Sequence, residues 1–182
     1  MVLLDSLKAT DYRPDASDIA KRMLEWAEKE NAFENNILGP TSKVALANFR
    51  DGVDASAITN KALSNGSSMR IAPIGCLFTP DQRKELIDYV YGVSKATHTS
   101  DVTIAGAAMI ALGMASIKMA GDMQANRRAF TTLLGDTGKA EALLGDLAKF
   151  ASETPFELPG LVTAAKKLLA FGFAAEDIIP IM

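Results

Sequence analysis

The feature that most constrains the fold of this chain is an uninterrupted stretch without charge, residues 102–117, which is rich in alanine and glycine. A helix that crosses a bilayer needs roughly 20 apolar residues, and this stretch is shorter. We therefore predict a helix buried in the core of the protein and no membrane role. Its small side chains would let neighbouring helices approach closely, and Ser100 or Asp101 is placed to cap its start.

Apolar residues also recur at helical spacing along most of the remaining chain. Residues 15–30 show this pattern clearly, with Trp26 on the apolar face. Thr41 or Ser42 is placed to cap a helix that follows residues 39–40. Further helical segments are predicted at residues 127–134, 139–151 and 161–171. Alternating runs typical of strands are scarce, so we predict a single all-α domain over residues 1–182.

Composition excludes several classes of function. The chain has 182 residues, which is enough for one domain with a substantial core. Its formal net charge of −3 gives no electrostatic reason to expect a nucleic-acid partner. The single cysteine, Cys76, allows no disulfide framework. With no signal peptide visible, we expect a cytoplasmic protein.

The polar segment SNGSS at residues 64–68 runs directly into an apolar segment. Gly66 permits backbone conformations that a Cβ forbids, and Asn65 tolerates left-handed geometry. If a helix starts near Ser67, its free N–H groups face this segment and form an anion site. The alternative is an ordinary turn with a capped helix start, which composition alone favours.

Two further residues could carry chemistry, and each has a structural alternative. Arg70 could contact a ligand phosphate or, the interpretation we favour, form a structural ion pair. His98, the only histidine, could donate a hydrogen bond to a ligand oxygen or satisfy backbone groups at a helix junction. Metal ligands come in clusters, so a lone histidine does not indicate a metal site.

Three segments, in this order, resemble the ADP-ribosylglycohydrolase family. GPTS at residues 39–42 resembles the family's Gly-Pro-Thr-Thr element, after a helix that carries a tryptophan. SNGSSMRIAPIG at residues 64–75 resembles its Asn-Gly-small-small-Met-Arg-x-x-Pro segment. ATHTSD at residues 96–101, followed by an alanine-rich stretch, resembles its Thr-His-x-(x)-Asp segment. The resemblance runs from about residue 2 to about residue 119.

The resemblance implies an all-α, multi-helix orthogonal bundle that removes ADP-ribose from proteins or small molecules with a pair of magnesium ions. Asn65, Gly66 and Ser67 would line the pocket near the diphosphate and ribose. Met69 would pack near the same ligand, and His98 would contact it from the facing helix junction. The expected partner is thus ADP-ribose or an ADP-ribosylated substrate.

The acidic motifs that hold magnesium in this family are not found in the chain. Magnesium prefers carboxylate oxygens, which the family supplies in an Asp-Asp-Thr motif and a Gly-Asp-Thr-Asp-Thr-like motif. Asp136 lies in GDTG, half of the second motif, and we interpret it as a helix cap. The pairs Asp15/Asp18 and Asp51/Asp54 fall at helix starts, where acids are common. We predict no metal ligand and a bundle truncated at both ends.

Several functions remain open at this level. The chain could be a catalytically incomplete ADP-ribosylglycohydrolase, one half of a split enzyme completed by another chain, or a domain that has lost the chemistry. The alternative from a different class is a helical module for protein–protein interaction or oligomerisation. A truncated core exposes apolar helix faces, so a homo-oligomer or a complementing chain is expected.

Overall fold

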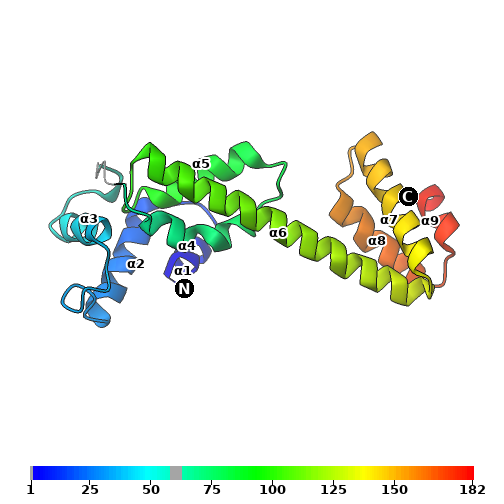
Figure 1. The fold of residues 1–182 in the computed structure, drawn as a ribbon, viewed down its shortest axis with the longest axis horizontal. Helices are drawn as coiled ribbons and strands as arrows, with labels where there is room; N and C mark the ends of the chain where they lie inside the picture. Colours follow the sequence, from blue (N-terminus) through cyan, green and yellow to red (C-terminus); the bar gives the residue numbers. More distant parts are fainter. Residues whose placement is uncertain (1, 58–62) are drawn as a thin grey trace. The chain divides into compact units, whose positions relative to one another are not determined.

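The structure is a computed structural model that describes residues 2–57 and 63–182, and all regular structure in these residues is helical. The predicted all-α class is therefore confirmed for the part of the chain described (Figure 1). In chain order the elements are α1 (Val2–Ala9), α2 (Ala16–Lys29), α3 (Pro40–Arg50), the 3-10 turn η1 (Ala55–Ala57), α4 (Gly66–Gly75), α5 (Arg83–Ser94), α6 (Asp101–Leu134), α7 (Thr137–Glu153), α8 (Leu158–Ala170) and α9 (Ala175–Ile181).

The helices form two compact units, Met1–Lys118 and Met119–Met182, which we call the N-terminal and C-terminal units. The long helix α6 runs from the first unit into the second. The single domain expected over residues 1–182 stays a prediction. Each unit has its own cluster of buried apolar side chains.

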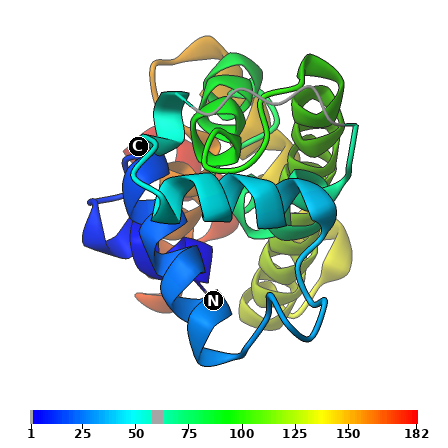
Figure 2. The ribbon, with the colours of Figure 1, turned by 90° about the vertical axis from the view of Figure 1, so that its left-hand side faces the viewer.

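The N-terminal unit buries one apolar core to which every helix from α1 to the first part of α6 contributes. Helix α2 packs against α1, α3 and α5, and α3 crosses it in the view of Figure 2. Helix α4 lies so close to α6 that a Cβ on Gly75 would be 2.1 Å from the carbonyl oxygen of Ala111. Glycine at this position is therefore required by the close approach of two helices.

Helix α6 is buried along one face only, so the prediction of a helix enclosed by the core is wrong in this respect. Ala107 and Ala111 are fully buried, whereas Val102 and Met109 are 68% and 75% exposed, because the other helices of the unit cover one side. The helix also continues through residues 127–134, where we expected a separate helix. By length and composition α6 could cross a membrane, a test that core helices of soluble proteins also pass, and 33% of its most apolar window is buried.

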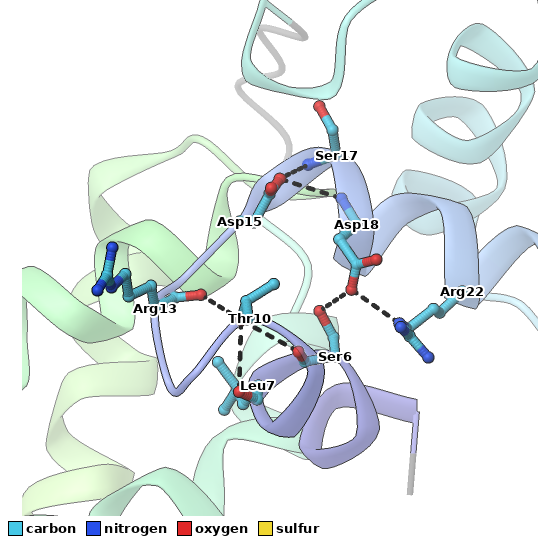
Figure 3. Close-up of polar contacts among 8 residues, drawn as sticks. All are labelled: Ser6, Leu7, Thr10, Arg13, Asp15, Ser17, Asp18 and Arg22. Atoms are coloured by element: carbon cyan, nitrogen blue, oxygen red, sulfur yellow. Dashed lines mark hydrogen bonds and ion pairs between the residues drawn. The ribbon is translucent and has the colours of Figure 1, made fainter.

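Polar contacts fix the corner between α1 and α2 (Figure 3). The carboxylate of Asp15 accepts the N–H groups of Ser17 and Asp18 at 2.9 and 3.1 Å and thereby caps α2. Asp18 accepts hydrogen bonds from Arg22 Nε at 2.7 Å and Ser6 Oγ at 2.5 Å. These two bonds, that of Arg22 first, lower the pKa of Asp18. Both acids of this pair thus serve the helix start, as the sequence predicts.

The C-terminal unit is a small helical bundle around an apolar core that includes Phe130 and Leu147. Gly135, with φ +67°, ends α6, and Asp136 caps α7 by accepting the N–H of Lys139 at 2.9 Å. This bond, together with the N–H of Gly138, lowers the pKa of Asp136. The interpretation of Asp136 as a helix cap is confirmed.

Candidate functional site

A cluster of hydrogen-bonded side chains in the N-terminal unit brings together residues that are far apart in the sequence. Thr41 comes from α3, Ser64 from the segment before α4, Arg70 from α4, and Thr97 and His98 from the turn between α5 and α6. We call these five residues the His98 cluster. His98 and Thr97 are fully buried and Thr41 is nearly so, whereas Ser64 and Arg70 are partly exposed at the edge of the cluster.

Helix α3 brings Thr41 into the cluster by starting earlier than expected. Pro40 is the first helical residue and Gly39 takes the N-cap position, without a side-chain cap. Thr41 and Ser42 therefore lie in the first turn with buried side chains and are not the caps that the sequence predicts. The hydroxyl of Thr41 is free to accept a hydrogen bond from Ser64 Oγ at 2.8 Å because it does not cap the helix.

Both ring nitrogens of His98 have hydroxyl partners. Nε2 lies 2.9 Å from Ser64 Oγ, and Nδ1 lies 2.7 Å from Thr97 Oγ1. The backbone N–H of His98 donates to the carbonyl of Ser94 at 2.8 Å. Burial, and then the positive charge of Arg70, lower the pKa of His98 to about 4. The ring is therefore neutral at physiological pH.

Arg70 is a cation whose partners among the described residues are neutral. Its Nη2 donates to Thr97 Oγ1 at 2.5 Å and its Nη1 to the carbonyl of Gly66 at 3.4 Å, while Nε is buried without a partner. Burial lowers the pKa of Arg70 to about 10. No described acid pairs with it, so the ion pair that we favoured from the sequence is wrong for this part of the chain.

Helix α4 starts directly at the cluster. Its first intrahelical hydrogen bond runs from the N–H of Met69 to the carbonyl of Asn65. The N–H groups of Gly66, Ser67 and Ser68 precede that bond and have no intrahelical acceptor, and the Asn65 side chain does not cap them. The predicted helix start near Ser67 is confirmed, one residue earlier, and it offers donors to an anion.

The structure brings two of the five predicted ligand residues into direct contact. A Cβ on Gly66 would lie 2.9 Å from Cε1 and 3.0 Å from Nε2 of His98, so glycine lets this ring pack against the helix start. Asn65 is exposed at the N-cap position. Ser67 is buried and bonded to Ser94 Oγ at 2.5 Å, whereas Met69 is 78% exposed. The ligand roles of all five stay predictions.

Sequence reasoning missed the three hydroxyl residues of the His98 cluster, Thr41, Ser64 and Thr97. Each lies inside one of the segments singled out above, and Thr97 is next to His98. Their hydrogen bonds join residues 23 and 34 positions apart as well as neighbours. Nothing in the spacing of the sequence reveals such partners, because only the packing of α3, α4 and α5 places them together.

The magnesium pair that the resemblance implies does not fit the residues described. No group of three acidic, histidine or cysteine side chains that could hold a metal occurs among them. The His98 cluster offers hydroxyls, a neutral imidazole and a guanidinium, and the positive charge of Arg70 disfavours a second cation beside it. The cluster is thus built to meet an anion or a polar ligand, and no chemical step through a metal follows from it.

A shallow cleft of about 600 Å³ lies within the C-terminal unit. Its walls come from α8, the two residues before it and the end of the chain and are mainly apolar, with Glu157 and Lys167 among the lining residues. None of the predicted ligand residues lines it. The cleft therefore adds nothing to the site suggested by the sequence.

Comparisons with known proteins give the following matches. A family model described as ADP-ribosylglycohydrolase matches residues 1–181. The Escherichia coli (strain K12) protein YegU, described as uncharacterized, is 40% identical over 111 residues, which are 61% of this chain and 33% of YegU. An uncharacterized protein of Archaeoglobus fulgidus is 29% identical over 116 residues, or 63% of this chain and 36% of that protein. The chain thus spans about a third of these curated relatives. No solved structure matches it significantly.

Proposed function

Because this chain belongs to the ADP-ribosylglycohydrolase family, we propose that its N-terminal unit binds the ADP-ribosyl group of a modified protein or small molecule. The observation that carries the proposal is the contact of Gly66 with the His98 ring at the start of α4. This contact places a histidine beside backbone N–H groups that have no intrahelical acceptor. A diphosphate, with its many acceptor oxygens, matches such a set of donors.

The assignment of residues to parts of the ligand follows the family. The N–H groups of Gly66, Ser67 and Ser68 would meet the diphosphate, and Asn65 would offer its amide to a ribose hydroxyl. His98 would donate to a neighbouring ligand oxygen. Met69 is exposed on the same helix and would cover the ligand from outside.

Hydrolysis of the glycosidic bond is a second part of the proposal. In the family this reaction is associated with magnesium, a hard cation that prefers oxygen ligands. Among the described residues, no cluster of three or more carboxylates, histidines or cysteines could hold such an ion. We propose that residues or a partner chain outside this sequence complete the enzyme, and that a cytoplasmic complex or homo-oligomer is the working form. Exposed apolar side chains on α6, such as Val102 and Met109, support such an association.

Titration with ADP-ribose tests the binding proposal. Isothermal calorimetry and thermal unfolding of the full chain would be followed with and without magnesium, since a ligand that binds the native state raises the unfolding midpoint. We expect binding without magnesium. Asn65→Ala should weaken it about three- to tenfold, the cost of about one hydrogen bond. The matched control is Asn48→Ala, an exposed asparagine on α3 of the same unit.

The competing outcomes separate the function classes. Equal losses of ADP-ribose affinity in Asn65→Ala and Asn48→Ala would mean that the ligand binds elsewhere in the molecule. No binding at millimolar ADP-ribose would leave the interaction module, the alternative class of function, as the better description. Release of ADP-ribose from a modified protein by this chain alone would show that the enzyme needs no completing chain.

A further inference from the structure

The hydrogen bonds of the His98 cluster run in one direction, and this direction identifies the ring nitrogen that carries the proton. The hydroxyl of Ser64 donates its single proton to Thr41 Oγ1 at 2.8 Å. Toward His98 Nε2, at 2.9 Å, Ser64 can therefore only accept. It follows that Nε2 carries the N–H and donates it to Ser64.

The contacts on the other side of the ring are compatible with this tautomer. A neutral imidazole with its proton on Nε2 has a lone pair on Nδ1, which must accept a hydrogen bond. Thr97 Oγ1, which lies 2.7 Å from Nδ1, is the donor that this tautomer requires. Arg70 cannot accept, so its Nη2 donates to the same Thr97 oxygen at 2.5 Å. The chain of donors thus runs from Arg70 through Thr97 and His98 to Ser64 and Thr41.

Arg70 also keeps the ring neutral. The guanidinium is buried and has no acidic partner among the described residues. Its charge therefore opposes a second positive charge on His98. An imidazolium would also donate from Nδ1, and Thr97 Oγ1 would then have to accept from two cationic groups, Nδ1 and Arg70.

We propose that Arg70 and Thr97 are positioning residues, which hold the single proton of a neutral His98 on Nε2, where the ring faces Gly66 at the start of α4. The inference rests on the proposed function in one respect: a ligand oxygen takes the place of Ser64 as the acceptor of this proton. His98 Nε2–H and the N–H groups at the start of α4 then form one set of donors. Neither Arg70 nor Thr97 needs to touch the ligand.

The single histidine makes the test direct. In protein labelled with ¹⁵N-histidine, the two ring nitrogens of His98 give the only histidine signals, and their shifts report the tautomer. We expect protonated Nε2 and unprotonated Nδ1 in the wild type. Thr97→Val, which removes the hydroxyl, should give a mixture of tautomers, and the matched Thr97→Ser should keep the wild-type pattern. Arg70→Met should raise the pH at which the His98 ring titrates, because it removes a neighbouring positive charge. Arg70→Lys keeps a positive charge and should bring this pH back toward the wild-type value.

The ligand arm uses ADP-ribose as the probe. Thr97→Val should weaken its binding about tenfold and Thr97→Ser less than twofold, since one well-placed donor is lost in the first variant only. A wild-type ring protonated on Nδ1 would overturn the proposal, and this measurement needs no variant to fold. So would an unchanged tautomer in Thr97→Val. Absence of ADP-ribose binding in the wild type would reject the proposed function, while the ring shifts would still decide the positioning roles.

Discussion

The two compact units differ in what they bury. All the polar side chains that are buried among the described residues belong to the N-terminal unit: Ser6, Thr41, Ser42, Ser67, Ser94, Thr97, His98 and Thr103. The buried side chains of the C-terminal unit are apolar, with Phe130 the largest. Burying polar groups is favourable only when each is hydrogen-bonded. The N-terminal unit therefore buries polar side chains that are hydrogen-bonded to one another, whereas the C-terminal unit buries apolar side chains that pack by shape.

The glycines show the same difference. In the N-terminal unit, Gly66 and Gly75 are places where a Cβ would collide with a buried ring or with the backbone of another helix. In the C-terminal unit, a Cβ added to Gly145 or Gly160 would meet no atom of another element within 4 Å. Close packing around specific groups is thus concentrated in the unit that holds the His98 cluster.

The largest expected effect comes from adding a methyl group to one glycine in each unit. Gly75→Ala should lower the free energy of unfolding by about 3 kcal/mol or prevent folding, because its Cβ would lie 2.1 Å from a backbone oxygen of α6. Gly145→Ala, inside α7, should raise it by about 0.5–1 kcal/mol, since alanine is the better helix former. Urea unfolding followed by circular dichroism measures the free energy of unfolding of both variants. Equal changes in the two variants would contradict the difference in packing between the units.

The second effect concerns the buried histidine and depends on pH. The folded pKa of His98 is about 4, below the usual 6.5, so the unfolded chain binds the proton first as the pH falls. The stabilisation is complete above pH 6.5, decreases as the pH is lowered, and is lost near pH 4. Linkage gives about 3 kcal/mol over this window. Urea unfolding at several pH values gives the slope of the free energy of unfolding against pH. This slope should be clearly smaller in His98→Gln than in the wild type, and identical slopes would contradict a neutral buried ring.

The smallest effect tests a polar contact at the surface of the same unit. Asp18→Asn removes the charge that accepts from Arg22 and Ser6 and should cost about 1 kcal/mol at pH 7. The pKa of Asp18 is lowered, so this contribution is present above pH 4 and disappears as the pH falls through the folded pKa. Thermal unfolding at pH 7 and pH 2 measures it. Asp88→Asn, an exposed acid on α5, is the control and should have no comparable cost.

Local sequence signals predicted much of the fold correctly because they act over a few residues. The capping role of Asp136 and the helix that starts beside Ser67 follow from side chains and backbone groups within one turn. The predictions that failed concern how other elements of the fold surround a residue. Val102 is exposed although its segment is apolar, and Arg70 has hydroxyl and carbonyl partners in place of a carboxylate.

The sequence by itself determined that the chain is helical and that it belongs to its family, because helical spacing and short ordered motifs are local properties. Only the tertiary structure decided what surrounds His98. The hydrogen bond between His98 and Ser64 requires the segment before α4 to lie beside the turn between α5 and α6, and its direction depends on which hydroxyl has already donated its proton. The sequence motif identifies His98 as a candidate residue. The packing around it determines whether the ring is charged and which ring nitrogen donates a hydrogen bond.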